Sequence, residues 1–387
     1  MIFLGLASNY SARDVLRHSF SVGSKKDYKN LELALSKRYG TTLENTSLIY
    51  SGRSAISLAL KSFIESNRLK KGDHVAVNSF TCFAVVEAVK NAGLVPVFLD
   101  LPDPKKAPSP DYSPETLAVA CEKDKKLKVF ILQNTFGLPV DLKKFLEVKK
   151  KYNLLLLEDL AHSAGRFYTL NAKKREIGTV GEATCLSFGK GKSIDTITGG
   201  AVLLRDPTLS FPKSFNKSAL KKRRKSGDVP RASWYPLFGA IARGLAHLKL
   251  EKYWLGLLLK LRWIERSADT KLLENTTITN WQAKLALRQL KSLKDKPLRE
   301  FFLVENREET LKILKKKGIR LEESWYEVPV SPARYYKKTN FPEKENKNAV
   351  FFAKHVLNLP TWYYDKKHQK ELAYAKKILK ENALNGN

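Results

Sequence analysis

The sequence predicts an α/β protein of three layers, in which helices cover both faces of a mainly parallel sheet. Six short runs between residues 74 and 205 are apolar throughout, as is typical of strands buried on both faces. They are HVAVNS (74–79), VPVFLD (95–100), KVFILQ (128–133), NLLLLE (153–158), ATCLSF (183–188) and GAVLLR (200–205). Helical patterns separate the runs, among them AVVEAVKNAG (84–93) and DLKKFLEVKKKY (141–152). Alternating strands and helices of this kind predict a layered α/β domain.

The remaining chain extends this domain in three segments. We expect a large α/β domain over 1–205, a basic helical insertion over 206–270, a return helix over 271–295 and a small α+β domain over 296–387. The last segment contains a strand candidate, FFLV (301–304), a helical pattern over 305–318 that ends at Gly318, and a final Lys-rich helix.

The predicted insertion is both basic and amphipathic. It contains KKRRK (221–225), followed by two stretches in which apolar residues recur at helical steps. These residues are Trp234, Phe238, Ile241, Leu245 and Leu248 in the first stretch, and Trp254, Leu257, Leu258, Leu261 and Ile264 in the second. Two interpretations stay open: a helical hairpin packed on the protein or a partner subunit, or a helix pair lying in an anionic membrane surface over 221–266.

Composition excludes several classes of protein. The 387 residues include 43% apolar residues, which excludes a disordered chain. Three scattered cysteines predict no disulfide framework, six scattered histidines show no zinc-ligand spacing, and no metal site is expected. We find no signal-peptide pattern and no apolar stretch long enough to span a bilayer, so we expect a cytoplasmic protein, with peripheral attachment to the inner membrane surface as an addition.

The net charge of +31 arises from 70 Lys and Arg residues against 39 Asp and Glu residues. Three readings of this excess are open: nucleic-acid binding, an anionic membrane surface, and a lysine-rich solvated face. Charge is the only feature that favours nucleic acid, so we expect no specific nucleic-acid partner.

Polar residues whose side chains could react or bind a ligand follow the predicted strands. In parallel α/β sheets the chemistry lies beyond the carboxyl ends of the strands. Asp159 follows one run, Lys192 follows another, and SGRSAISLAL (51–60) opens a helix whose free N–H groups suit an anion. A carboxylate, an amine and an anion cradle are the groups needed to hold pyridoxal phosphate. A phosphate-binding P-loop is excluded because Leu186 stands where that motif requires Gly.

At these residues the chain resembles the DegT/StrS-type nucleotide-sugar aminotransferases, which have the aspartate aminotransferase fold (fold type I of pyridoxal phosphate enzymes). Seven blocks in family order carry the resemblance. They are SGRSAISLAL, NSFTCFAVVEAVKNAGLVPVFLD, QNTFGLPVDL, LEDLAHSAG, GTVGEATCLSFGKGK with ITGGAVLL, NTTITNWQAKLALRQL and HVLNLPT.

The resemblance implies roles for individual residues. It makes Lys192 the Schiff-base lysine and Asp159 the partner of the cofactor's ring nitrogen. Ser187 matches a serine that contacts the phosphate, and Ser54 lies in the phosphate turn. Each residue also has a structural interpretation: a surface lysine, a strand-end cap or a helix N-cap.

Two further positions extend the implied site. His162 occupies a position often filled by a Gln that reaches the ring hydroxyl of the cofactor, and a buried structural histidine is the alternative. Asn275 aligns with an asparagine that crosses to the phosphate of the neighbouring subunit. The resemblance therefore implies a homodimer with shared sites.

The chain departs from the family at several of these positions. Arg53 replaces the usual Thr, and Thr277 replaces the usual Arg, which leads to the hypothesis that Arg53 supplies the charge for the phosphate. The aromatic residue that stacks on the cofactor aligns with Cys82, and we expect Phe83 to take its place. Thr198 stands where an acidic residue is usual.

The expected activity is transfer of an amino group from an amino acid, by resemblance glutamate, to a keto-sugar linked to a nucleotide. The resemblance places this reaction in the biosynthesis of cell-surface polysaccharides or glycans. Sugar dehydratases of the same fold carry a histidine in place of the lysine, and Lys192 argues against that class. A protein of the same fold that binds or regulates without turnover is the main alternative, and a nucleic-acid-binding protein is a weaker one.

Overall fold

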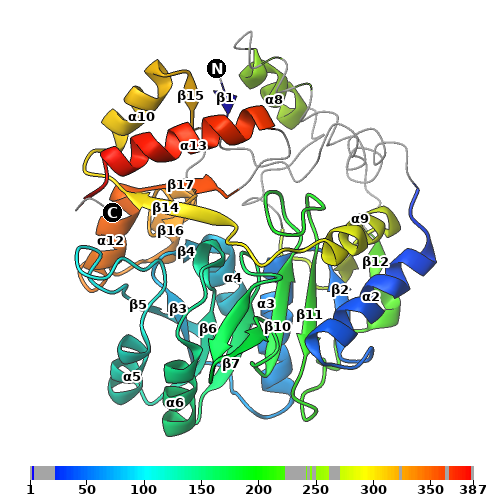
Figure 1. The fold of residues 1–387 in the computed structure, drawn as a ribbon. Coiled ribbons are helices and arrows are strands. Elements are labelled where there is room, and N and C mark those ends of the chain that lie inside the picture. Colours follow the sequence, from blue (N-terminus) through cyan, green and yellow to red (C-terminus); the bar gives the residue numbers. More distant parts are fainter. Residues whose placement is uncertain are drawn as a thin grey trace.

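The computed structural model describes residues 2–3, 22–222, 241, 245, 250–260, 271–321, 325–361 and 366–384. Within these residues a seven-stranded sheet forms the centre of the molecule, in the order β2-β11-β10-β7-β6-β3-β5 (Figure 1). Its strands are β2 (Thr46–Ile49), β3 (His74–Asn78), β5 (Val95–Leu99), β6 (Leu127–Leu132), β7 (Leu155–Asp159), β10 (Ala183–Ser187) and β11 (Gly200–Leu204). Only β11 runs antiparallel to its neighbours in this sheet. The predicted mainly parallel sheet is confirmed.

Helices cover both faces of the sheet. On one face lie α2 (Lys25–Tyr39), α5 (Pro114–Lys123), α6 (Leu142–Tyr152) and α9 (Asn280–Lys291), and on the other lie α3 (Gly52–Glu65) and α4 (Phe83–Asn91). Alternation along β7 divides the apolar residues between the two cores, since Leu156 packs on the first face and Leu155 and Leu157 pack on the second. The predicted three layers are therefore confirmed.

The C-terminal part is a smaller α+β unit that packs over one end of the sheet (Figure 1). Its strands β14 (Arg299–Leu303) and β17 (Val356–Pro360) pair antiparallel. Its helices are α10 (Arg307–Lys316), α11 (Ala333–Tyr336), α12 (Lys347–His355) and α13 (Lys366–Glu381). Strand β16 (Val330–Ser331) pairs with β4 (Thr81–Cys82) in a separate two-stranded sheet and so connects this part to the segment between β3 and α4.

Short strand pairs complete the described structure. They are β1 (Ile2–Phe3) with β15 (Ile319–Arg320), β8 (Phe167–Leu170) with β9 (Lys173–Glu176), and β12 (Lys221–Lys222) with β13 (Thr276–Thr277). The first predicted amphipathic stretch lies outside the described residues, apart from Ile241 and Leu245. The second overlaps α8 (Glu251–Lys260), and the remainder of KKRRK after Lys222 is likewise outside them. No helix in the described ranges has the length and apolar character that crossing a membrane requires.

Candidate active site

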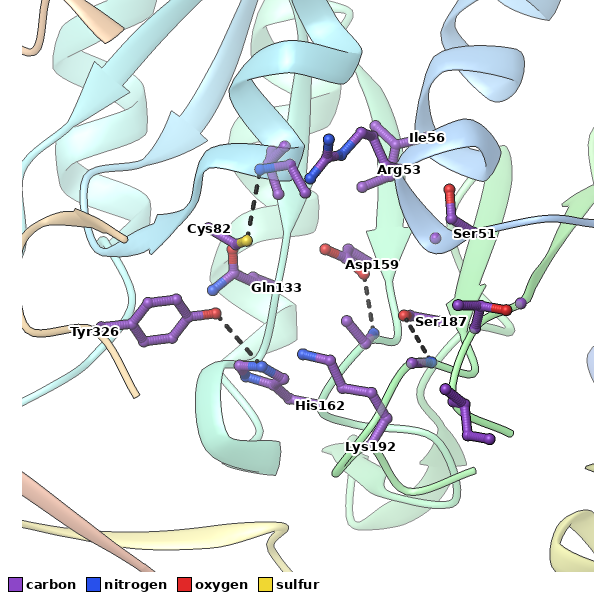
Figure 2. A pocket seen from close by; sticks show the side chains of 18 residues that line it. Ser51, Arg53, Ile56, Cys82, Gln133, Asp159, His162, Ser187, Lys192 and Tyr326 are labelled. Carbon is purple, nitrogen blue, oxygen red and sulfur yellow. Dashed lines mark hydrogen bonds between the residues drawn. The ribbon is translucent and has the colours of Figure 1, made fainter. Parts of the chain in front are cut away.

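A cavity lies at the carboxyl ends of β7 and β10, beside the start of α3 (Figure 2). Five of the predicted site residues line it: Arg53, Asp159, His162, Ser187 and Lys192. Cys82 and Thr198, two of the positions that depart from the family, line it as well. The strand-end residues that the sequence singled out thus come together in space.

Asp159 and its neighbour Glu158 point to opposite sides of β7, because successive side chains of a strand alternate. Glu158 faces away from the cavity and accepts hydrogen bonds from the backbone N–H groups of Gly178, Val180 and Gly181. Asp159 faces the cavity, where Ala161 N donates to its Oδ1 at 2.9 Å. Burial raises the pKa of Asp159 from 3.8 to about 6. One carboxylate therefore holds a loop, and the other is presented to a ligand.

Lys192 lies on a loop that follows β10 and returns to β11. The loop closes through hydrogen bonds from Phe188 N to Gly199 O at 2.8 Å and from Lys190 N to Ile197 O at 3.2 Å. The side chain of Lys192 points into the cavity near Asp159 and His162 (Figure 2). Burial lowers the pKa of its amine, which favours the neutral, nucleophilic form.

Two glutamines of α9 hold this lysine loop from behind. Gln282 Nε2 donates to Thr198 O at 2.9 Å and to Thr196 O at 3.2 Å. Gln289 accepts from Asp195 N and donates to Asp195 O, both at 2.8 Å. Within the loop, the buried Asp195 carboxylate accepts from Gly191 N and Ile197 N. This support keeps Ile197 at a φ of 74°, a conformation that β-branched residues rarely adopt.

The N-terminus of α3 forms an anion cradle against Ser187. Ser51 caps the helix by accepting from Ser54 N at 3.1 Å, and the next residue, Gly52, lines the cavity. A Cβ atom added to Gly52 would lie 2.7 Å from Ser187 Cβ, so the close approach requires glycine. Helix N-termini attract anions through their N–H groups and dipole.

Arg53 lies one residue further along α3 and is nearly buried, with 7% of its surface exposed. Its guanidinium forms an ion pair with Glu87 of α4 and lies 6.0 Å from the centroid of the Phe83 ring. The cation that we expected at the phosphate is therefore present in the cavity wall, with a carboxylate partner that the sequence did not reveal.

His162 is buried, and both of its ring nitrogens contact the protein. Phe136 N donates to Nδ1 at 3.1 Å, and Nε2 lies 3.4 Å from the hydroxyl of Tyr326. The ring stacks on Trp325, with centroids 4.8 Å apart. Burial lowers the pKa of His162 well below 6.5, so the ring is neutral.

Three predicted site residues do not line the cavity. The Phe83 ring stacks on Tyr335 at 4.8 Å, and the position that faces the cavity belongs to Cys82. Ser54 Oγ accepts from Leu273 N at 3.0 Å. Asn275 O accepts from Lys221 N at 3.1 Å as part of the β12–β13 pair. Phe83, which we expected to stack on the cofactor, thus packs on Tyr335 of α11 in the structure.

Thr277 also lies away from the cavity lining and has a structural place. Its hydroxyl donates to Leu48 O at 2.7 Å and lies 2.8 Å from the hydroxyl of Tyr28. Thr277 therefore connects α2 with β2 through its hydroxyl.

Sequence reasoning missed two polar side chains that line the cavity, those of Gln133 and Tyr326. Gln133 is the last residue of the predicted run 128–133 and directly follows β6, so its place at the carboxyl end of a strand was a signal for it. Tyr326 comes from the C-terminal part, and no pattern in the sequence marks it.

Comparison with known proteins identifies relatives of this chain. The model of the DegT/DnrJ/EryC1/StrS aminotransferase family matches residues 8–226, more than half of the chain. GDP-perosamine synthase of Escherichia coli O157:H7 is 30% identical over 172 residues, which span 44% of this chain and 42% of that protein. UDP-N-acetyl-3-dehydro-alpha-D-glucosamine 3-aminotransferase of Acidithiobacillus ferrooxidans is 29% identical over 160 residues, 41% of this chain and 40% of that protein. The matched part thus spans about two fifths of each relative.

Solved structures show the same fold. PseC of Helicobacter pylori, an aminotransferase in pseudoaminic acid biosynthesis, aligns with a TM-score of 0.63 at 17% identity, covering 98% of this chain and 99% of that one. GDP-4-keto-6-deoxymannose-3-dehydratase with bound GDP-perosamine aligns with a TM-score of 0.65 at 17% identity, covering 97% and 100% of the two chains.

Proposed function

The chain belongs to the DegT/DnrJ/EryC1/StrS aminotransferase family, and from this premise we propose that it is a pyridoxal phosphate-dependent aminotransferase. The amino group moves from glutamate to a keto group on a nucleotide-linked sugar, in the biosynthesis of cell-surface polysaccharides or glycans. One observation carries the proposal: a single buried cavity contains a lysine, a carboxylate and a helix N-terminus. The named activities of the relatives, GDP-perosamine synthesis and 3-amination of a UDP-sugar, support the substrate class.

The residues of the cavity fit pyridoxal phosphate. Burial lowers the pKa of the Lys192 amine, which suits a bond to the carbonyl carbon, and the Asp159 carboxylate suits the ring nitrogen. The N-terminus of α3, Ser187 and the Arg53 guanidinium suit the phosphate, and Gly52 leaves the room that a Cβ would fill. Ala161 and Cys82 are small residues that line the same cavity and leave space for a flat ring.

Lys192 and Asp159 have separate roles in the proposed reaction. When bound, the cofactor supplies a carbonyl group for the amine and an electron-withdrawing ring. Lys192 Nζ holds that carbonyl carbon and, once released, moves a proton at the α-carbon of the donor. Asp159 keeps a proton on the ring nitrogen, which it can do as an anion paired with a cation in a buried site. Burial of the lysine amine in the cavity lowers its pKa and so favours its nucleophilic form.

Absorbance tests this proposal. Purified protein with added pyridoxal phosphate is expected to develop the visible band of the lysine-bound cofactor, and glutamate is expected to bleach it. Keto-sugar nucleotides that restore the band identify the acceptor. A protein that binds no cofactor under these conditions contradicts the enzyme proposal.

The main rival is a protein of this fold that binds a ligand without turnover. The ion pair between Arg53 and Glu87, and Cys82 in the aromatic position, favour it, because both alter the wall that faces the cofactor. The same titration separates the two proposals, since the rival predicts either no band or a band that glutamate leaves unchanged.

We also propose a homodimer with shared sites, and peripheral attachment to an anionic inner membrane surface through residues 221–266. Exposed apolar residues of α8 support the attachment, with Tyr253 77% and Leu257 47% exposed. Analytical ultracentrifugation tests the dimer. Flotation with anionic liposomes tests the attachment, and equal flotation of the intact chain and a variant lacking 232–266 contradicts it.

A further inference from the structure

The hydrogen bonds of His162 determine which of its ring nitrogens carries the proton. Nδ1 accepts from Phe136 N, so this nitrogen holds a lone pair. A neutral imidazole with an accepting Nδ1 carries its hydrogen on Nε2. The partner of Nε2 is the hydroxyl of Tyr326, so the histidine donates and the tyrosine oxygen accepts.

This direction leaves the hydrogen of the Tyr326 hydroxyl for another acceptor. A phenol has one hydrogen, and it cannot point at a nitrogen that is itself donating. Tyr326 lines the cavity together with Lys192 and Asp159, and Figure 2 shows its hydroxyl directed inward toward His162. The hydrogen is therefore available to a ligand in the cavity.

The position of Tyr326 is held from several sides. Its ring meets the edge of Phe80 at 4.9 Å, and only 7% of the residue is exposed. Four residues further along, Val330 pairs with Thr81 in the β16–β4 ladder.

The two residues that hydrogen-bond to the His162 ring both have a strained backbone. Tyr326 has a φ of 68° and Phe136 has a φ of 62°, a region that bulky residues rarely occupy. Strain of this kind persists where the surrounding structure imposes it, and it concentrates at functional sites. Both strained residues are hydrogen-bond partners of the same histidine.

We propose that Tyr326 is a ligand-binding residue whose hydroxyl, oriented by His162, donates a hydrogen bond to an anionic oxygen of the molecule bound beside Lys192. This inference rests on the proposed function. The oxygen belongs either to the ring hydroxyl of the cofactor, as its phenolate, or to the carboxylate of the amino-acid donor. His162 acts through Tyr326 and is a positioning residue.

The charges around the hydroxyl suit this acceptor. The Arg299 guanidinium is a cation near the site, and it lies with the Lys192 amine against the ring of Trp325, at 4.2 Å and 4.5 Å from the ring centroid. Asp159 is the carboxylate on the same cavity wall as Lys192. An anionic oxygen placed near Arg299 and the phenol receives a hydrogen bond from the phenol in addition to the attraction of the guanidinium.

Tyr326→Phe removes only the hydroxyl and tests the proposal in the full-length protein. With pyridoxal phosphate as the probe, we expect its dissociation constant to rise about tenfold and the pH titration of the visible band to shift, if the cofactor supplies the oxygen. If the donor supplies it, cofactor binding is unchanged and the KM for glutamate rises about tenfold while kcat changes less. Unchanged values in both experiments overturn the proposal.

Two sets of variants complete the test. Tyr112→Phe is the matched control, because this buried hydroxyl donates to Ile131 O outside the cavity, and it should leave both constants unchanged. His162→Gln keeps one acceptor and one donor and should change these constants less than His162→Met, which cannot donate and should resemble Tyr326→Phe. A wild-type protein that shows no cofactor band overturns the proposed function together with this inference, whereas equal Tyr326→Phe and wild-type titrations overturn this inference alone.

Discussion

The lysine loop (188–199) and the opposite wall of the cavity, formed by Arg53, Cys82 and Tyr326, are built differently. The lysine loop is held by backbone hydrogen bonds of its own, by Asp195 within it and by two glutamines of α9 behind it. The opposite wall takes its residues from α3, from β4 and from the C-terminal part of the chain, which side-chain contacts and one short strand pair connect.

This difference in construction coincides with where the sequence departs from the family pattern. The lysine loop contains Lys192, which matches the family, and one departure, Thr198, whose backbone and hydroxyl oxygens accept hydrogen bonds from Gln282 Nε2. The opposite wall contains the departures Arg53 and Cys82. Variants on the two sides should therefore differ in both size and kind of effect.

The largest effect is expected for Lys192→Ala. Removing the amine removes both the attachment point and the proton carrier, so activity should fall at least about a thousandfold. Transaminase assays and loss of the visible cofactor band check this. Lys190→Ala, a neighbouring lysine on the same loop that does not line the cavity, is the control. Comparable loss in both variants would assign the effect to the loop and not to the amine.

Asp159→Asn should lower activity and raise the stability of the cofactor-free protein. The carboxyl pKa is 3.8 when unfolded and about 6 when folded, so the folded state binds the proton more tightly. The free energy of unfolding therefore decreases as pH rises from about 4 to 6, and the penalty stays constant above that range. At pH 8 the Asn variant should gain on the order of 1–3 kcal/mol, and below pH 4 it should gain nothing. Thermal melts across this pH range test the sign, and a variant less stable at pH 8 contradicts it.

Gln289→Ala tests the support behind the lysine loop. The change removes both hydrogen bonds to Asp195, which typically costs about 1–3 kcal/mol, so affinity for pyridoxal phosphate should fall about tenfold. Lys291→Ala, an exposed change on the same helix, should leave affinity unchanged. Equal affinities of Gln289→Ala and the wild type would show that the loop holds its shape without α9.

The smallest effect is expected on the opposite wall. Glu87→Gln removes the charge that pairs with Arg53 and should leave the guanidinium more attractive to a phosphate. We expect pyridoxal phosphate to bind several-fold more tightly, and Arg53→Ala to bind it several-fold more weakly. Titration of cofactor absorbance measures both. If neither variant changes the dissociation constant, Arg53 has no part in holding the phosphate.

The location of functional residues beyond the carboxyl ends of parallel strands explains which site residues the sequence could predict. The apolar runs 153–158 and 183–188 became β7 and β10, and the residues after them, Asp159 and Lys192, lie in the cavity. The antiparallel direction of β11 was not predicted, because a buried apolar run looks the same in either direction. The strand β2 was also missed.

Long-range contacts account for the other misses. The pairing of Arg53 with Glu87 depends on how α3 packs against α4, and no local pattern encodes it. Tyr326 reaches the cavity only because the C-terminal part lies over the sheet, so its place is a property of the tertiary structure. Phe83 is a further example: it begins α4 and packs on Tyr335, whereas Cys82, the last residue of β4, lines the cavity.

The short ladder between β4 and β16 joins two parts of the molecule at the edge of the cavity. Thr81 N donates to Pro329 O at 2.9 Å, Ser331 pairs with Cys82, and both Cys82 and Tyr326 line the cavity nearby. A rotation of the C-terminal part would therefore act on the cavity wall through this ladder. The amide hydrogen of Thr81 is consequently a natural reporter of ligand binding, and its exchange with solvent should slow when a ligand draws the two parts together.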